Sequence, residues 1–459
     1  MSTLTIAIVI VFCIGYFCIA IESVTKINKA AIALLMFVAT WTLFMIDPAS
    51  YIATAIGEMK AAAVSEVIEH HLGSTATTLF FLMGAMTIVE LVDQNGGFNF
   101  VRDTLQTKSK RALLWRIAFM TFILSAILDN LTTSIVMIMI LRKLVSDKTD
   151  RIIYAALVVI SANSGGAFSP IGDVTTIMLW NKGVITAAGV IMEIFIPSLV
   201  SMVIPAYILS LSLKGNLVAQ QETAILEESD GLSAGQRKII FFLGVGGLIF
   251  VPIFKTITHL PPYLGMLISL SVLWVTTEIL SRRHSKEGHE LPTAVSTLEH
   301  VDVPTVLFFL GILMAVSCLK VAGILGSLAQ GLDSMRGIEA GGEVVGFFLI
   351  DFIIGILSSI VDNVPLVAAV QGMYPMSPEG FIANHPFWEF LAYCAGTGGS
   401  LLIIGSAAGV AVMGMEKIDF IWYLKKISWL AFAGYVAGAV VFVAMNLMFE
   451  PYEWWSQMV

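Results

Sequence analysis

The sequence predicts an all-α membrane protein that crosses the bilayer many times. Of its 459 residues, 57% are hydrophobic and only 13% carry charge, whereas roughly 25% are charged in an ordinary soluble domain. Only the hydrocarbon core of a bilayer accommodates so much apolar sequence. Two further observations are an internal repeat and the interruption of several apolar runs by Asp, Asn and Gly. Together they predict two inverted repeats, each with about five transmembrane helices and one re-entrant hairpin, and discontinuous helices at the midplane.

The composition excludes several classes of function. The net charge of −8 leaves no basic patch for a nucleic-acid backbone. The four cysteines lie in or beside apolar runs, and their spacing fits neither a disulfide framework nor a zinc site. We therefore expect no cofactor and no nucleic-acid partner. The first apolar run, residues 4–21, is expected to be a retained span and not a signal peptide.

Apolar runs of about 20 residues, the length that spans a bilayer, give ten candidate crossings. They are 4–22, 30–46, 75–93, 152–180, 184–213, 237–257, 261–281, 303–322, 386–414 and 427–449. The stretch 51–71 is too polar to cross, and we expect it to form a surface or interfacial helix. Two other stretches, 111–145 and 341–373, are long, and each is interrupted in its middle by an Asp-Asn pair.

Positive charges on both sides of the first interrupted stretch predict its course. Lysine and arginine gather just before residue 117 and again from residue 142, and such loops stay in the cytoplasm. With both ends inside, the segment has to enter and return as a re-entrant hairpin, with Asp129 and Asn130 near its tip. Ten crossings plus two hairpins place most of the 25 Lys and Arg residues inside when both termini lie on the outer, periplasmic side.

An internal repeat divides the chain into two copies of one unit. Residues 123–130 and 356–363 share six of eight letters at an offset of 233 residues, and shared Asp, Asn and Gly letters do not follow from apolar composition. The first copy is 1–215, with hairpin 111–145 and broken helix 152–180. The second is 237–450, with hairpin 341–373 and broken helix 386–414, and residues 216–236 form a cytoplasmic linker. Five crossings per copy is an odd number, so the second copy inserts upside down, as in secondary transporters.

The hairpin tips carry the first candidate site residues. Asp129 and Asp362 are each followed by an Asn, at positions 130 and 363, and each lies four residues after a Ser, at positions 125 and 358. Residues four apart share a helix face, so each tip offers a hydroxyl, a carboxylate and an amide, which are hard oxygen ligands suited to small cations. The alternative is a capped helix break, in which Asp and Asn only satisfy free N–H groups.

The glycine-broken segments carry the second set. Unwound backbone at membrane depth is tolerated where it lines a cavity or is buried in protein, and it can coordinate cations. Close helix packing through small residues is the alternative. The candidate residues here are Asn163, Asp173, Thr175, Thr176, Thr397 and Ser400.

The two copies differ at the most polar position, because Asp173 aligns with Ser406. Asp129, Asp173 and Asp362 are then three deep carboxylates, an odd number that suits exchange of a monovalent cation such as Na⁺ for protons. If burial moves a carboxylate pKa toward neutrality, the two ions compete for the same oxygens, and each excludes the other.

Other acids are weaker candidates. Glu90 lies toward the cytoplasmic end of its span and serves either as a gate or pH-sensing group or as a residue that snorkels to the interface. Glu193 and Asp351 have no acidic counterpart at the repeat offset. All seven His residues fall outside the predicted spans, which removes the general base that a serine protease needs. No Walker A pattern is present, which argues against ATP-driven transport, and the chain is not expected to be an enzyme.

The segments 128–134, 161–176 and 358–365 resemble the NhaD-type sodium/proton antiporters. That family belongs to the ion transporter superfamily, together with arsenite permeases and divalent-anion/sodium symporters. The resemblance covers about residues 90–414 and is most specific in 161–176. It implies exchange of Na⁺ and Li⁺ for H⁺ across a bacterial inner membrane in pH homeostasis, a homodimer with scaffold and transport domains, and elevator motion.

Many superfamily relatives carry Ser-Asn-Thr at the hairpin tips, where this chain has Asp129-Asn130 and Asp362-Asn363. Two acids at the tips suit a cation better than an oxyanion, which they repel. An arsenite or other anion permease is the alternative within the superfamily. An intramembrane aspartyl protease is a remote alternative, since its two carboxylates have to share a proton at close range.

Overall fold

A computed structural model describes residues 3–20, 22–52, 57–213, 215–217, 232–285, 294–336, 344–360, 362–374, 376 and 381–449. Within these ranges the chain is almost entirely helical and has no strand; Ser109 and Asn216 form an isolated β-bridge. The prediction of an all-α polytopic protein is confirmed. Residues 218–231 of the expected linker 216–236, and residues 341–343 and 361 of the expected hairpin 341–373, lie outside the described residues.

The chain forms two compact units. The smaller unit comprises Met1–Met83, Asp302–Phe347 and Val364–Ile382, and the larger unit comprises Gly84–Val301, Phe348–Asn363 and Ala383–Val459. Each unit therefore draws on both halves of the sequence. One boundary falls at Met83, inside helix α4.

The smaller unit is built on helices that pack closely through small residues. Its elements are α1 (Thr3–Ala20), α2 (Glu22–Thr25), α3 (Lys29–Phe44), η1 (Pro48–Ser50), η2 (Gly57–Met59), most of α4 (Lys60–Gln94), α14 (Val303–Val321), α15 (Ile324–Arg336) and most of α17 (Asn363–Met373). A Cβ atom at Gly311 on α14 would lie 2.5 Å from the backbone of Ala33 on α3. Trp41 Nε1 donates to the Met314 carbonyl at 2.9 Å, so its buried indole N–H is satisfied.

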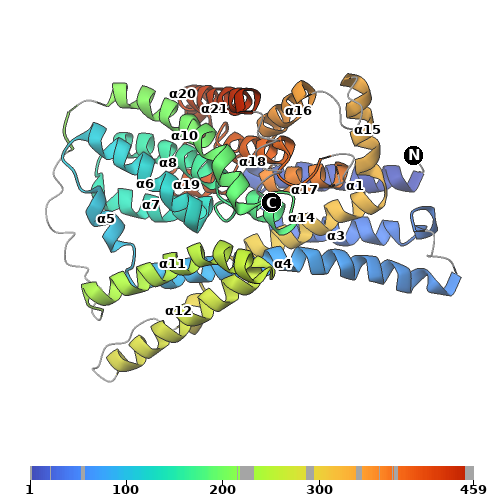
Figure 1. Ribbon diagram of the computed structural model, residues 1–459, viewed down its shortest axis with the longest axis horizontal. Coiled ribbons are helices and arrows are strands. Elements are labelled where there is room, and N and C mark those ends of the chain that lie inside the picture. The colour runs from blue at the N-terminus through green and yellow to red at the C-terminus, as the bar shows by residue number, and fades with distance from the viewer. Residues whose placement is uncertain are drawn as a thin grey trace. The chain divides into compact units, whose positions relative to one another are not determined.

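The larger unit holds the interrupted segments. Its elements are α5 (Asn99–Leu105), α6 (Lys110–Leu128), α7 (Asn130–Leu144), α8 (Lys148–Ala167), α9 (Val174–Asn181), α10 (Ala187–Ser212), α11 (Ala234–Thr258), α12 (Pro262–Ser285), α13 (Ala294–Leu298), most of α16 (Val344–Leu357), α18 (Pro386–Gly398), α19 (Ala407–Glu416), α20 (Phe420–Lys426) and α21 (Ser428–Phe449). Helices α6 and α7 both pack on α8, and α10 packs on α21 (Figure 1).

Helix α8 is the buried centre of the larger unit. All of its residues from Tyr154 to Ala167 are buried, as expected of a helix whose small and apolar residues surround it on every side. At Gly165 a Cβ would lie 2.2 Å from the carbonyl oxygen of Phe122 on α6, so this contact admits only glycine. The equivalent position at the repeat offset, Gly398 on α18, makes the same approach, 2.0 Å, to the carbonyl oxygen of Gly355 on α16.

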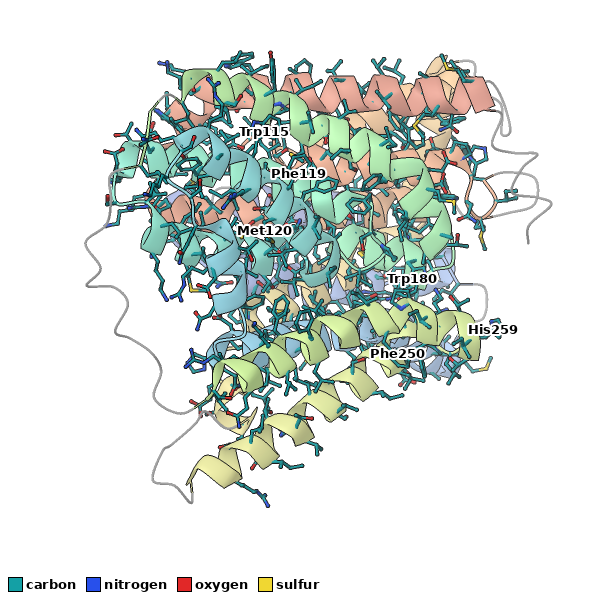
Figure 2. The ribbon with its side chains drawn as sticks, turned by 60° about the vertical axis from the view of Figure 1, so that its left-hand side comes forward. Trp115, Phe119, Met120, Trp180, Phe250 and His259 are labelled. Carbon is teal, nitrogen blue, oxygen red and sulfur yellow. The ribbon has the colours of Figure 1, made fainter. Side chains whose placement is uncertain are left out.

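Seven helices of the described chain are long and apolar enough to cross a membrane. They are Lys60–Gln94, Lys110–Leu128, Ala187–Ser212, Ala234–Thr258, Pro262–Arg282, Val303–Val321 and Ser428–Met448. Six overlap a crossing expected from the sequence, and Lys110–Leu128 overlaps the first arm of the expected hairpin. Large apolar side chains stay exposed on these helices, among them Phe119 on α6 and Phe250 on α11 (Figure 2), as a lipid-facing surface requires.

Residues 60–71 of the surface helix expected over 51–71 are helical and almost all at least partly exposed, but they do not form a helix of their own. They are the first turns of α4, which continues without a break through the apolar run 75–93. The helix contains no Pro, and its lone interior glycines, Gly73 and Gly84, cost only about 1 kcal/mol each. Polarity alone therefore did not mark a helix end.

Candidate functional site

Asp129 forms the break between α6 and α7. Its φ is +87°, a left-handed value that L-residues rarely adopt and Asp tolerates better than most. Its carboxylate accepts hydrogen bonds from the backbone N–H and the hydroxyl of Thr132, both at 2.8 Å, and so caps α7. Asp129 is buried. The helix cap that the sequence allowed as an alternative to a cation site is therefore present at Asp129.

Asp173 is the residue on which the two Asp-Asn segments converge. It caps α9 by accepting from the Thr175 N–H at 3.0 Å, and it is 1% exposed. The Asn130 amide donates to Asp173 Oδ2 at 3.0 Å. The Asn363 amide, from the other Asp-Asn pair, donates to the same oxygen at 3.1 Å and to Oδ1 at 3.3 Å. Residues 43 and 190 positions away along the chain thus share one carboxylate.

Asn163 extends this network to the second broken helix. Its Oδ1 accepts from the Asn130 amide at 3.1 Å, and its own amide donates to Ser406 Oγ at 3.0 Å. Ser406 caps α19 by accepting from the Gly409 N–H. Sequence reasoning did not select Ser406, although its alignment with Asp173 at the repeat offset was a signal that could have identified it.

The two serines predicted at the hairpins occupy matching positions. Ser125 Oγ donates to the Ala162 carbonyl at 2.6 Å, and Ser358 Oγ donates to the Ala395 carbonyl at 2.9 Å. The donors and the acceptors are both separated by the repeat offset. In this conformation the two hydroxyls tie each interrupted segment to a broken helix and are not directed at a carboxylate.

Three other predicted hydroxyls are also engaged by backbone carbonyls. Thr176 Oγ1 donates to the Asp173 carbonyl at 2.8 Å. Thr397 Oγ1 donates to the Tyr393 carbonyl, and Ser400 Oγ to the Thr397 carbonyl, both at 2.6 Å. Thr175 contributes its backbone N–H to Asp173. The hydroxyls of this group therefore line the breaks, while the Asn amides make the side-chain contacts with the central carboxylate.

Three aspartates share the electrostatic environment of the site. Asp129 and Asp362 both act on Asp173 as like charges. Asp362 is only partly buried. Within the described ranges, no ion pair to Asp129 or Asp173 is recorded, and no group of three or more His, Cys, Asp or Glu side chains is placed to hold a metal ion. A cation there would have to combine one carboxylate with amide, hydroxyl or carbonyl oxygens.

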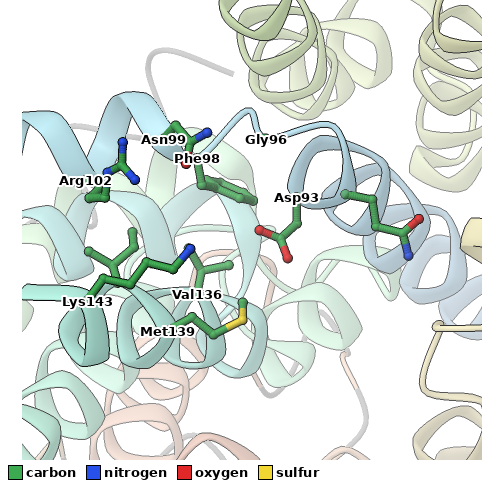
Figure 3. Close-up of a pocket in the computed structure, with 10 residues that line it drawn as sticks. Asp93, Gly96, Phe98, Asn99, Arg102, Val136, Met139 and Lys143 are labelled. Atoms are coloured by element: carbon green, nitrogen blue, oxygen red, sulfur yellow. The ribbon is translucent and has the colours of Figure 1, made fainter. Parts of the chain in front are cut away.

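Glu90 lies on α4, away from these aspartates in the hydrogen-bond network. It accepts from the Gln94 amide at 2.9 Å, and Gln94 in turn accepts from the Thr297 hydroxyl at 2.9 Å. Gln94 and its neighbour Asp93 line a cavity of about 260 Å³ between the end of α4, α5 and α7 (Figure 3). The gate or pH-sensing role of Glu90 stays a prediction.

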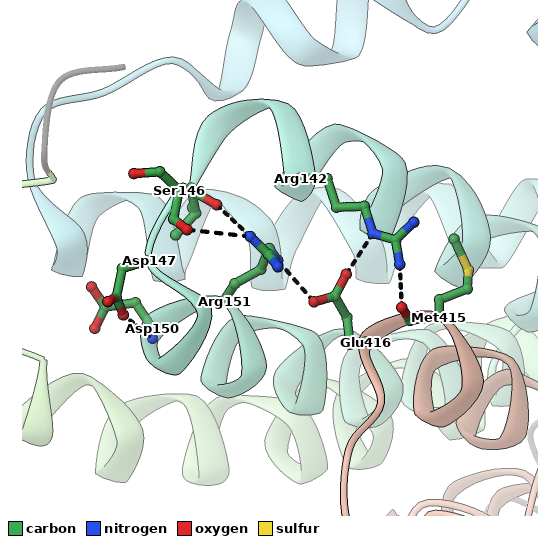
Figure 4. Close-up of polar contacts among 8 residues, drawn as sticks. Arg142, Ser146, Asp147, Asp150, Arg151, Met415 and Glu416 are labelled. Atoms are coloured by element: carbon green, nitrogen blue, oxygen red, sulfur yellow. Dashed lines mark hydrogen bonds and ion pairs between the residues drawn. The ribbon is translucent and has the colours of Figure 1, made fainter. Parts of the chain in front are cut away.

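A buried ion-pair cluster at the ends of α7, α8 and α19 was not predicted from the sequence. Glu416 accepts from Arg142 Nε at 2.7 Å and from Arg151 Nε at 2.8 Å (Figure 4), and Arg142 also donates to the Met415 carbonyl. Burial raises the pKa of Glu416, but the hydrogen bonds and charges of the two arginines outweigh it and hold this pKa below its ordinary value. The arginines lie 274 and 265 residues from their partner, so no local pattern signals the pairing.

The fold and the site together define a class of protein. The larger unit combines apolar helices long enough to span a bilayer with a polar centre built where helices are broken, as secondary transporters do. Comparison with known proteins gives the particular family. The model of the citrate transporter family matches residues 16–392. The chain belongs to this family, among its NhaD-type members, and it is a transporter and not an enzyme.

Three relatives show the extent of the similarity. Sodium/proton antiporter 1 of Arabidopsis thaliana is 44% identical over 97% of this chain and 73% of its own length. Sodium/proton antiporter 2 of the same plant is 42% identical over 95% of this chain and 99% of its own length. The Na⁺/H⁺ antiporter NhaD of Vibrio cholerae is 30% identical over 97% of this chain and 92% of its own length. Sodium/proton antiport is therefore an activity of the family.

Proposed function

We propose that this protein exchanges Na⁺, and also Li⁺, for H⁺, and that both ions compete for the Asp173 carboxylate with Asp129 and Asp362 nearby. The observation that carries the proposal is the surroundings of Asp173. It is 1% exposed, and its recorded donors, Asn130, Asn363 and the Thr175 N–H, are all neutral. Such donors stabilise a carboxylate without cancelling its charge, so a mobile cation completes the site.

Competition for one carboxylate is sufficient for coupled exchange. An isolated ionised carboxylate in a membrane interior costs several kcal/mol, and either a proton or Na⁺ removes that cost. Because one ion occupies the oxygens that the other needs, Na⁺ binding displaces the proton and protonation displaces Na⁺. The net charge is neutralised in both loaded states, which are the states that have to change sides.

We further propose the two inverted repeats and the elevator motion. The matched Ser125 and Ser358 hydrogen bonds and the matched close approaches of Gly165 and Gly398 support the repeat. All of the predicted site residues belong to the larger compact unit, which supports its assignment as the transport domain and the assignment of the smaller unit as the scaffold.

The homodimer and the placement of both termini on the outer face of a bacterial inner membrane are proposals that rest on the resemblance and on the distribution of Lys and Arg. Light scattering on the detergent-purified protein measures the first. Labelling of single cysteines introduced near each end in intact cells measures the second; labelling only after the membrane is permeabilised would contradict it.

The exchange itself is tested in everted membrane vesicles that hold an imposed ΔpH. Addition of Na⁺ or Li⁺ should dissipate the gradient, and K⁺ serves as the comparison cation. Vesicles that respond to none of these cations from pH 7 to 9.5 would refute the proposal, and a response to arsenite or citrate instead would assign the chain to the anion permeases. Asp129→Asn and Asp362→Asn should each abolish the response at unchanged protein level, with the exposed Asp103→Asn as the matched control.

A further inference from the structure

A second buried carboxylate lies outside the network of Asp173. Asp351 is on α16 and is 0% exposed. Neither of its oxygens has a hydrogen-bond partner among the residues that the structure describes. Buried polar side chains without partners are rare in native proteins, and each one calls for an explanation.

The surroundings of Asp351 are aromatic and are already hydrogen-bonded among themselves. Tyr435 on α21 packs against Phe352 with its ring tilted and the ring centroids 5.0 Å apart, and its hydroxyl donates to the Phe352 carbonyl at 2.8 Å. Tyr393 on α18 stacks on Tyr435 and donates to the Tyr435 carbonyl at 2.8 Å. Among the residues that the structure describes, Cys394 and Tyr435 are the titratable groups recorded as interacting electrostatically with Asp351. Neither supplies a positive charge.

This environment decides the protonation state of Asp351. A charged carboxylate transferred to an apolar interior loses its hydration without compensation, and in practice such a group becomes neutral. Asp351 is therefore a carboxylic acid in this conformation. An apolar side chain of similar volume would fill the same space without an unsatisfied polar group. The aspartate at position 351 therefore lowers the stability of the fold, and its presence calls for a functional explanation.

Asp351 is connected to the site of Asp173 through two short paths. Along α16 it lies seven residues, or two turns, before Ser358, which donates to the Ala395 carbonyl. Across to α18 it interacts with Cys394, the residue before Ala395. Gly396 lies two residues after Cys394 on the same helix, and a Cβ atom at Gly396 would lie 3.8 Å from Asp173 Oδ2. A rearrangement around Asp173 thus acts on the helices that enclose Asp351.

We propose that Asp351 is a second proton carrier of the transport cycle. In this conformation it holds a proton; in a later step, when water reaches it, the O–H bond breaks, the proton passes to water as H₃O⁺ and the carboxylate remains. Reprotonation from the other side of the membrane restores the acid. The inference rests on the proposed exchange of Na⁺ for H⁺ and adds to it one proton per cycle that does not compete with Na⁺ for Asp173.

The decisive measurement is the coupling ratio in proteoliposomes, obtained as the pH gradient that just balances a fixed Na⁺ gradient at a set membrane potential. Asp351→Asn keeps the size of the side chain but cannot release a proton, and it should lower the ratio by one H⁺ per Na⁺. Ser198→Ala is the matched control, since Ser198 Oγ is another buried oxygen without a partner in the described chain; its ratio should equal that of the wild type. An unchanged ratio in Asp351→Asn would overturn the proposal.

Two further measurements cover the remaining outcomes. If Asp351→Asn stops net exchange, retained exchange of labelled Na⁺ for Na⁺ supports a proton-carrying role, and loss of both overturns it. If Asp351→Asn does not fold, Asp351→Leu replaces it, because the apolar surroundings accommodate leucine.

Transport by the wild-type protein distinguishes failure of the antiport proposal from failure of the proposal for Asp351. If wild-type protein exchanges no H⁺ for Na⁺, the antiport proposal itself fails. The titration of Asp351 is then read from infrared spectra of wild type minus Asp351→Asn. Loss of the protonated-carboxyl band as the pH is raised would support proton release, and persistence of the band at every pH would overturn it.

Discussion

Asp173 and Glu416 are two buried carboxylates of the larger unit that are satisfied in opposite ways. Glu416, with a side chain 1% exposed, is held by two arginines. Asp173 is equally buried but receives neutral N–H groups from two asparagines and a backbone amide. The first carboxylate has fixed positive partners that neutralise it permanently. The Asp173 carboxylate has hydrogen-bond donors in place, but these donors do not neutralise its negative charge.

The difference separates a structural carboxylate from one available to a mobile ion. A fixed guanidinium competes with any dissolved cation, so Glu416 offers nothing to Na⁺ and instead ties α19 to α7 and α8. At Asp173 the amides hold the carboxylate in place, and a cation or a proton is the remaining way to remove the cost of its charge. Burial alone therefore does not distinguish the two carboxylates; a fixed counter-charge, present at Glu416 and not found at Asp173 among the described residues, does.

The largest expected effect is on transport. Asp173→Asn should reduce Na⁺-dependent dissipation of ΔpH by about 10- to 100-fold, because interactions with a charged group are worth about 1.5–3 kcal/mol and each 1.4 kcal/mol is a factor of ten in binding. Glu416→Gln, measured in the same vesicles at matched protein level, should stay within a few-fold of the wild type. Equal losses in the two variants would break the comparison.

The second effect is on stability and has the opposite order. Glu416→Gln leaves Arg142 and Arg151 without their counter-charge and should destabilise the protein by about 2 kcal/mol, less than a fully buried pair because Arg142 is 45% exposed and partly screened. Asp173→Asn should lower the thermal midpoint of the detergent-purified protein less than Glu416→Gln does. A midpoint for Glu416→Gln equal to that of the wild type would show that the ion pairs contribute nothing.

The pH dependence of stability follows from the same ion pairs. The pKa of folded Glu416 lies below its ordinary value of 4.5, so its contribution is fully present above about pH 4.5 and is lost as the pH falls through the folded pKa. The midpoint of the wild type should therefore fall in this acid range more steeply than that of Glu416→Gln. Parallel curves for the two proteins would contradict this assignment.

A smaller effect is expected from the amides that hold Asp173. Asn130→Ala and Asn363→Ala each remove one donor worth about 1 kcal/mol, so each should weaken the apparent Na⁺ affinity by about fivefold and leave the direction of exchange unchanged. Their similarity tests whether the two segments act equivalently. An effect of one substitution and none of the other would show that only one amide positions the carboxylate.

The smallest effect is expected at Glu90. Its carboxylate is bonded to the neutral Gln94 amide and lies apart from the network of Asp173, and glutamine preserves its shape. Glu90→Gln should therefore change the maximal exchange rate by no more than about threefold, the scale of one modest hydrogen bond. Rates measured from pH 7 to 9.5 give the check, and a shift of the whole pH profile would instead assign Glu90 a sensing role.

Much of the architecture was predictable because breaks in apolar sequence are local signals. Asp129 and the glycine-rich segments mark the ends of α6, α8 and α18 in the sequence itself. A helix end was expected at residue 71, but the polar residues there belong to a helix that continues without interruption. The ion pairs of Glu416 were not predictable, because they join residues more than 260 positions apart and an isolated Arg or Glu at a helix end is usually solvated.

The structure brings several of the candidate residues together around Asp173, and their ligand roles stay a prediction. The sequence predicted Asp129, Asp173 and Asp362 together as deep carboxylates, because an acid within an apolar run is conspicuous. In the structure the neighbouring residues Asn130 and Asn363 reach the centre, and Asp129 turns back to cap its own helix. Which of two adjacent side chains points inward depends on the backbone at the break, such as the φ of +87° at Asp129, and spacing does not determine it.

The helix caps at Asp129, Asp173 and Ser406 have a consequence for the speed of transport. Each marks the N-terminus of a helix, α7, α9 and α19, and helix N-termini carry partial positive charge. Three such ends near one carboxylate stabilise its ionised form while they repel a bound cation. A transporter gains from this opposition, because an ion held too tightly would leave too slowly. In the proposed exchange, the breaks that build the site would therefore also limit how long Na⁺ stays in it.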